Sequence, residues 1–305
     1  PIIQAPMALA AGGKLASAVS SAGGLGLIGG GYGDRDWILQ QFEVSTSNSI
    51  GCGFITWALK SKPHLLDEII SLKPKAVFLS FGNPQPLAAQ IKAAGITLIC
   101  QVQTLKDAKC ALDSGAVIIV AQGAEAGGHG EKRSTFTLVP EVANLITSHY
   151  PESLLCAAGG IADGRGLAAA LMLGADGVVI GSRLWATDEA LVHPNMHNCA
   201  INSSGDNTIR SKVMDIARHL NWPSRYTARV LQNEFTIKWH NNLTGLKTAS
   251  ETEAKKWAEA WNDGDTNIAN TFVGEATGLI NNITSAAKVL NSIASEAKEL
   301  LNKQW

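Results

Sequence analysis

The stretch TLICQVQTLKDAKCALDSGAVIIVA, residues 97–121, decides the fold class of this 305-residue chain. It holds an apolar run, Thr97–Gln101, a helix-length segment, Thr104–Asp113, and a second apolar run, Val117–Ala121. Threonine accepts hydrogen bonds from the free N–H groups at a helix start, and a glycine such as Gly115 commonly ends a helix. The stretch therefore predicts one strand–helix–strand unit, whose two strands are parallel.

The same unit repeats along the first 180 residues. The pattern predicts eight strands, at Ile2–Ala5, Leu25–Ile28, Ser49–Ile55, Ala76–Phe81, Thr97–Gln101, Val117–Ala121, Leu154–Ala157 and Gly177–Ile180. It predicts helices between them, at Gly13–Ala22, Asp34–Glu43, Pro63–Leu72, Pro84–Ala93, Thr104–Asp113, Pro140–Ser148 and Gly164–Leu173. Asp34, Thr104 and Asp163 are placed to cap helix N-termini.

Eight alternating units favour a closed (β/α)8 barrel, the TIM barrel, within the α/β class. The alternative is an open Rossmann sheet. Its glycine fingerprint should follow the first strand, where Ala5-Pro-Met-Ala8 stands instead. We place the barrel at residues 1–190, completed by part of the C-terminal helices. Residues 191–305 are predicted to form a smaller helical domain that covers the barrel mouth.

Composition excludes several classes of protein. The net charge of −1 offers no electrostatic attraction for nucleic acid or anionic lipid. No apolar run approaches the roughly 20 residues of a membrane span. Cys52, Cys100 and Cys156 lie in or beside apolar runs, where cysteine is usually a small buried hydrophobe. We therefore expect reduced thiols and a cytoplasmic, intracellular location.

The chemistry is predicted in the loop that follows the sixth strand, Gln122–Gly130, which reads QGAEAGGHG. Its glycines allow positive φ values and close approach to a ligand. Only Glu125 and His129 can move a proton there, and histidine titrates near neutral pH. His129 is thus the candidate catalytic residue. The competing interpretation is a glycine-rich turn with an incidental histidine.

The loops after strands seven and eight predict a phosphate site. Such loops in TIM barrels often bind phosphate through main-chain N–H groups and a helix N-terminus. Gly160 precedes the helix capped by Asp163, and Gly181 with Ser182 precedes a short helix. Ordinary turn chemistry is the alternative. Because the other strand ends look apolar, a planar ring with a phosphorylated tail fits best, and FMN is the expected cofactor.

A metal site is not expected. His193 and His197 are four residues apart, but Pro194 interrupts the helix between them and no acidic partner follows in a zinc-type motif.

Five motifs together resemble the nitronate monooxygenase family, also called 2-nitropropane dioxygenases. They are PIIQAPM at 1–7, AGGLG at 22–26, QGAEAGGH at 122–129, AGGIAD at 158–163 and GVVIGS at 177–182. The resemblance implies an FMN-bearing barrel with a helical domain over the flavin. It also implies His129 as the catalytic histidine and Gly127, Gly128, Gly160, Gly181 and Ser182 as main-chain contacts of FMN, with Met7 near the ring. Gln101 stands where some relatives have a flavin-contacting lysine.

The implied reaction oxidises an alkyl nitronate with O2 to a carbonyl compound and nitrite. A neutral His129 would remove the α-proton of a nitroalkane, or a protonated His129 would pair with a nitronate. The same features resemble FMN-dependent NAD(P)H:quinone reductases and enoyl-acyl-carrier reductases. A flavin-binding scaffold without activity is the non-enzymatic alternative. The partners expected are small molecules and O2, with no nucleic acid or membrane, and a homodimer is left open.

Beyond Thr187, two amphipathic helices are predicted, at Ser250–Ala260 and Thr277–Leu301. Their apolar stripes are expected to pack in the core, with aromatic side chains narrowing the substrate pocket.

Overall fold

Eight parallel strands form the central sheet of the computed structural model, which describes residues 1–303. Their order is β1-β9-β8-β6-β5-β4-β3-β2. The strands are β1 (Ile2–Gln4), β2 (Gly26–Gly31), β3 (Ile50–Ile55), β4 (Ala76–Ser80), β5 (Thr97–Val102), β6 (Ile118–Gln122), β8 (Leu154–Ala158) and β9 (Gly177–Ile180).

The two end strands of this order meet and close the sheet. Ile3 and Leu25 form a parallel bridge, and the N–H of Gln4 donates to the carbonyl of Leu25 at 2.9 Å. The predicted TIM barrel is therefore confirmed, and the open Rossmann sheet is not what forms.

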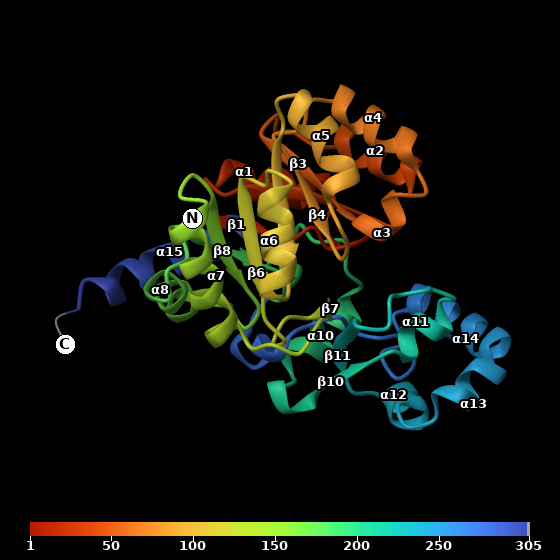
Figure 1. The fold of residues 1–305 in the computed structure, drawn as a ribbon. Coiled ribbons are helices and arrows are strands. Elements are labelled where there is room, and N and C mark those ends of the chain that lie inside the picture. Colours follow the sequence, from red (N-terminus) through yellow and green to blue (C-terminus); the bar gives the residue numbers. More distant parts are fainter. Residues whose placement is uncertain (304–305) are drawn as a thin grey trace.

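Helices surround the barrel (Figure 1). They are α1 (Gly13–Ser21), α2 (Arg35–Glu43), α3 (Thr56–Leu59), α4 (Pro63–Ser71), α5 (Gln85–Ala93), α6 (Leu105–Asp113), α7 (Thr135–His149), α8 (Gly164–Met172) and α9 (Ser182–Trp185). The side chains of Asp34, Thr104 and Asp163 accept N–H groups at the starts of α2, α6 and α8, as predicted. Helix α7 begins at Thr135, five residues before the predicted start, and contains Pro140.

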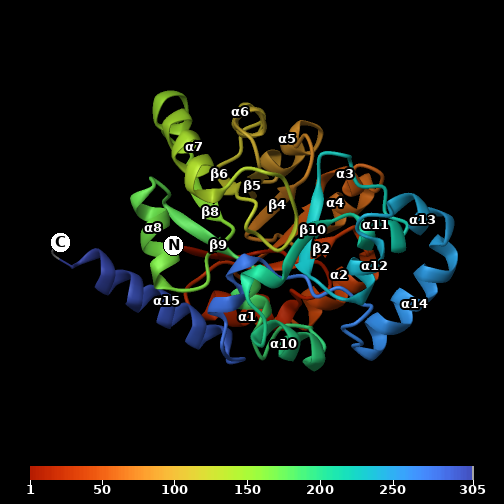
Figure 2. The ribbon, with the colours of Figure 1, turned by 90° about the horizontal axis from the view of Figure 1, so that it is seen from below.

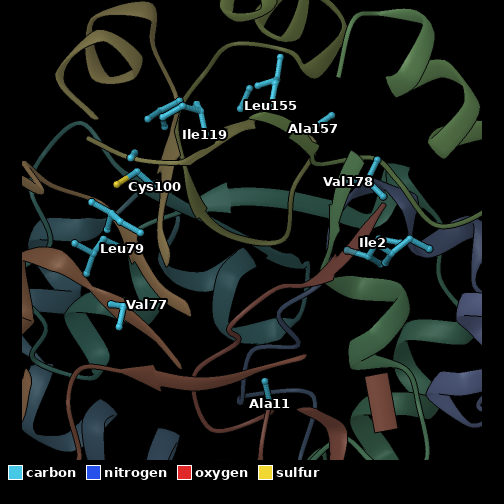
Figure 3. Close-up of a cluster of buried hydrophobic side chains, with 14 of the residues drawn as sticks. Ile2, Ala11, Val77, Leu79, Cys100, Ile119, Leu155, Ala157 and Val178 are labelled. Atoms are coloured by element: carbon cyan, nitrogen blue, oxygen red, sulfur yellow. The ribbon is translucent and has the colours of Figure 1, made fainter. Parts of the chain in front are cut away.

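Alternating side chains of the strands build two apolar layers. Ile3, Phe78 and Val120 belong to the cluster formed by one set, and Ile2, Val77 and Ile119 belong to the cluster that includes helix residues. Figure 3 shows side chains of the second cluster following one another around the sheet. The three cysteines predicted to be buried hydrophobes, at 52, 100 and 156, are buried and free.

The segment from residue 194 to residue 285, which we call the cover region, leaves the barrel and returns to it. It contains α10 (Pro194–Ile201), η1 (Gly205–Asn207), β10 (Thr208–Ser211), α11 (Val213–Ala217), β11 (Thr227–Leu231), α12 (Glu234–Trp239), α13 (Leu243–Thr248), α14 (Ser250–Asp263) and η2 (Glu275–Leu279). Helices α11–α14 form a body beside the barrel (Figure 1).

A second sheet, not predicted from the sequence, joins the two parts. Its strand order is β10-β11-β7, and β7 (Gly128–Gly130) comes from the loop that follows β6. His129 is paired with Ala228 of β11. The glycine-rich loop is thus held as an edge strand against the cover region.

The predicted helix Thr277–Leu301 is wrong over its first nine residues, 277–285. The chain forms η2 and an extended stretch, and only then α15 (Ala286–Leu301). Ile280 packs in the core of the cover region, whereas Leu290 and Ile293 pack in the barrel core, so one straight helix could not serve both. Helix α15 lies against α8 and α1 and completes the ring of barrel helices (Figures 1 and 2).

Within residues 1–303, no helix combines the length and apolar character needed to cross a membrane.

Candidate active site

One cavity of about 400 Å³ lies where the carboxyl ends of the barrel strands meet the cover region. Every residue that the sequence predicted for the site lines it: Met7, Gln101, Gly127, Gly128, His129, Gly160, Gly181 and Ser182. Trp222, Trp257 and Phe272 of the cover region line the same cavity. Residues from the carboxyl ends of all eight barrel strands and from the cover region therefore line one cavity.

His129 is held by a carboxylate from the cover region. Its Nε2 lies 2.9 Å and 3.1 Å from the two carboxylate oxygens of Asp215, on α11. The side chains of His129 and Asp215 are only 8% and 5% exposed. Because a carboxylate accepts but does not donate, Nε2 carries the proton in this pair, and Nδ1 is the nitrogen with a free lone pair when the ring is neutral.

Burial lowers the pKa of His129, and the hydrogen bond and charge of Asp215 oppose that shift. Two positive charges, Arg218 and Arg210, lower the pKa further. The net direction is downward from 6.5, which favours the neutral imidazole at pH 7. The arrangement suits proton acceptance at Nδ1 better than pairing of a protonated ring with an anion.

Trp222 covers one face of the imidazole. The two rings are stacked with centroids 3.5 Å apart and planes at 7°. The indole N–H donates to the hydroxyl of Tyr32 at 3.0 Å, and Phe81 packs edge-on against both rings. Aromatic side chains from two strand ends and the cover region thus fix the ring orientation of His129.

A glutamine network ties the main chain of His129 to the barrel. The Gln122 side-chain amide donates to the carbonyl of His129 at 3.1 Å. Its Oε1 accepts from Gln101 at 3.1 Å and from Gln103 at 2.8 Å. Gln101 therefore has a neutral partner and adds no charge to the cavity.

Glu125, the other proton-carrying side chain of the loop, has a structural role. Its carboxylate accepts the main-chain N–H of Thr135 at 3.0 Å and the Thr135 hydroxyl at 2.9 Å. These bonds hold the loop to the first turn of α7, where a negative charge is favourable.

The glycines at the ends of β8 and β9 leave their main-chain N–H groups beside the open cavity. Gly160 has φ of +77°, and the nearest atom to an added Cβ would be 3.5 Å away. At Gly181 the nearest would be 3.7 Å away, on Ala5. Within the described chain, no hydrogen-bond acceptor takes the N–H of Gly160, Gly181 or Ser182. Open space beside free donors fits the phosphate of FMN.

Two side chains that follow the end of β9, those of Ser182 and Arg183, form hydrogen bonds within the protein. The Ser182 hydroxyl accepts the N–H of Gly274 at 2.8 Å, and its own O–H remains available to donate to a ligand. Arg183 is buried and donates to the carbonyls of Ala186 and Asn282 at 3.0 Å and 3.2 Å. It therefore connects the barrel to the segment before α15.

Sequence reasoning missed Asp215, Trp222 and Gln122. Asp215 lies 86 residues from His129 and reaches it only because β7 pairs with β11. No spacing in the sequence signals that contact. Gln122 ends β6 and could have been selected by the rule that strand ends face the site.

Comparison with known proteins places these features in a family. A family model described as nitronate monooxygenase matches residues 58–296. The nitronate monooxygenase of Neurospora crassa is 33% identical over 99% of this chain and 90% of that protein. FabK from Thermotoga maritima is 30% identical, with a TM-score of 0.83, over 99% of this chain and 93% of that one. A nitroalkane oxidase from Streptomyces ansochromogenes has a TM-score of 0.83 at 23% identity, over 98% of this chain and 96% of that one, and shows the same fold.

Proposed function

This chain belongs to the nitronate monooxygenase family of flavin-dependent oxidoreductases, and we propose that it uses FMN and O2 to oxidise alkyl nitronates to a carbonyl compound and nitrite. The observation that carries the proposal is the cavity itself, which gathers a neutral, buried histidine and the free main-chain donors of the β8 and β9 ends. When bound, FMN would supply the redox chemistry by carrying electrons from the substrate to O2.

Two sets of residues would contact the two parts of FMN, its phosphate and its ring. The main-chain N–H groups of Gly160, Gly181 and Ser182, with the Ser182 hydroxyl, would hold the phosphate. Met7, Gln101, Gly127 and Gly128 would lie along the ring. Gly128 has φ of +70° and no atom within 4 Å of an added Cβ, so any side chain there would occupy ligand space.

His129 acts on the neutral nitroalkane. Nδ1 accepts the α-proton, Asp215 stabilises the resulting imidazolium through Nε2–H, and Trp222 holds the ring plane. A nitronate has already lost this proton and needs no base. The Asp215 contact therefore supports a role for His129 in proton removal.

The proposal is tested by nitrite release from propyl-1-nitronate and from 1-nitropropane, with purified flavin-loaded protein and no added nicotinamide nucleotide. We expect turnover of both in air. Absence of turnover unless NADH is present would reject the proposal.

Reduction of quinones or enoyl thioesters by NAD(P)H is the second candidate, favoured by the similarity to FabK over nearly the whole chain. Anaerobic mixing separates the two functions. Bleaching of the flavin within seconds by NADH supports the second candidate, and bleaching by the nitronate supports the first.

The acid limb of the pH profile should report on His129. Because its pKa is lowered from 6.5, we expect kcat/KM for the neutral nitroalkane to rise with pH and to reach half its plateau below pH 6.5. Rates are measured at saturating O2 from pH 5 to 8. The nitronate serves as control and should lack this limb, and a midpoint above pH 6.5 would contradict the assignment.

Gly160→Ala should weaken FMN binding at least 10-fold. Alanine at positive φ costs about 1–2 kcal/mol, and relaxing that strain turns the main-chain N–H away from the cavity. Gly95→Ala is the matched control, because Gly95 has φ of +69° and open space but lies outside the cavity. Both variants should lose similar thermal stability, and equilibrium dialysis should show weaker FMN binding in Gly160→Ala alone. Equal FMN affinity in the two variants would count against the phosphate site.

A further inference from the structure

Arg218 gives the cavity a positive charge that the reaction described above does not use. It follows the last residue of α11, one helical turn beyond Asp215. Among the residues that line the cavity in the described chain, it is the single arginine or lysine. Any charged substrate entering the cavity therefore meets a cation.

Two aromatic rings hold the guanidinium in place. Its central carbon lies 5.5 Å from the ring centroid of Tyr32 and 5.4 Å from that of Trp257. Contacts with ring faces do not consume the N–H donors of the guanidinium; one of its donors is directed at the Tyr32 hydroxyl, and the others remain for a ligand. The side chain is pre-ordered, so less conformational entropy is lost when it binds an anion.

Arg218 differs from the other arginines in having no carboxylate or set of carbonyl partners. Arg35, Arg133, Arg165, Arg225 and Arg229 each form ion pairs with Asp or Glu, and Arg183 and Arg210 donate to main-chain carbonyls. No Asp or Glu of residues 1–303 lies within ion-pair distance of Arg218. A cation without a counter-ion at a cavity wall is suited to an incoming anion.

We propose that Arg218 is a specificity-determining residue that makes the pocket prefer an anionic substrate, the nitronate, over the neutral nitroalkane. This rests on the proposed function. His129 is neutral and already donates to Asp215, so it supplies no positive charge to the substrate. The two planar oxygens of a nitronate match the forked donors of a guanidinium, as carboxylate oxygens do.

The alternative is that Arg218 only packs between Tyr32 and Trp257. A pair of unreactive probes separates the two roles. Butyrate and butyramide have nearly the same shape and differ in charge, and butyrate presents two planar oxygens as a nitronate does. Calorimetry with the flavin-loaded protein should show at least 10-fold tighter binding of butyrate than of butyramide, since hydrogen bonds to charged groups are the strong ones.

Arg218→Met should abolish this preference, and Arg218→Lys should retain part of it. Lys255→Met removes one positive charge from an exposed position on α14 and should leave the preference unchanged. A preference that survives in Arg218→Met, or is absent from the unmodified protein, overturns the proposal. Melting temperatures identify any variant that loses binding through unfolding. If Arg218→Met is unfolded, the butyrate preference of Arg218→Lys decides between the two roles.

Activity gives the second readout. Arg218→Met should raise KM for propyl-1-nitronate about 10-fold or more and change kcat/KM for 1-nitropropane less than about 3-fold. Equal losses for both substrates would overturn the specificity role. If the unmodified protein prefers butyrate through Arg218 but does not oxidise the nitronate, the proposed function fails and the anion site stands.

Discussion

Replacing His129 with asparagine should lower kcat/KM for 1-nitropropane by about 10²–10⁴-fold, the usual value of a placed general base. Asparagine offers no nitrogen that can take the α-proton. Its side-chain amide can still donate to Asp215, so the buried carboxylate keeps a partner and the fold should survive. The measurement is initial nitrite release at pH 8, where His129 of the unmodified enzyme is neutral.

The nitronate of the same compound is the internal control. It needs no deprotonation, so His129→Asn should oxidise propyl-1-nitronate with kcat within about 10-fold of the unmodified enzyme. FMN content, read from the visible spectrum, shows whether the cofactor is still bound. Full activity of the variant on 1-nitropropane would remove His129 from the role of base, and equal losses on both substrates would indicate a wider defect.

The barrel and its mouth could be predicted because both follow from local rules. The alternation of apolar runs and amphipathic segments specifies parallel strands, and parallel strands place their carboxyl ends together. Gly160 and Gly181 were therefore assigned to one site from sequence alone, although 21 residues separate them.

The support of His129 could not be predicted because it depends on a pairing between distant segments. The strands β7 and β10 are short, and glycine-rich β7 has no apolar alternation to mark it. Only the pairing of β7 with β11 brings α11, and with it Asp215, to the imidazole. The position of Arg218 could not be predicted for the same reason. It depends on contacts with Tyr32, which follows β2, and with Trp257 of α14, and these residues are far apart in the sequence.

Asp215→Asn should lower kcat for 1-nitropropane by about 10²-fold, toward the lower end of the effect of a general base. Asparagine carries no charge to stabilise the imidazolium that forms when Nδ1 takes a proton. Its amide can also present N–H to Nε2, which would move the ring proton to Nδ1 and block the base. Nitrite release under saturating substrate measures the loss, and Asp206→Asn, an exposed change in the same cover region, is the control.

The pH profile distinguishes this role from a purely structural one. Asp215 supplies the interactions that raise the pKa of His129 against burial and against the charges of Arg218 and Arg210. Without the carboxylate, the acid limb for 1-nitropropane should move to lower pH. Asp215→Glu keeps a carboxylate, so it should recover part of the rate and move the midpoint of the limb back toward that of the unmodified enzyme. A limb that stays in place in Asp215→Asn, with a lowered melting temperature, would mean that Asp215 only stabilises the fold. A limb that moves down while kcat falls would show that this carboxylate, contributed by the cover region, sets the proton affinity of a histidine contributed by the barrel.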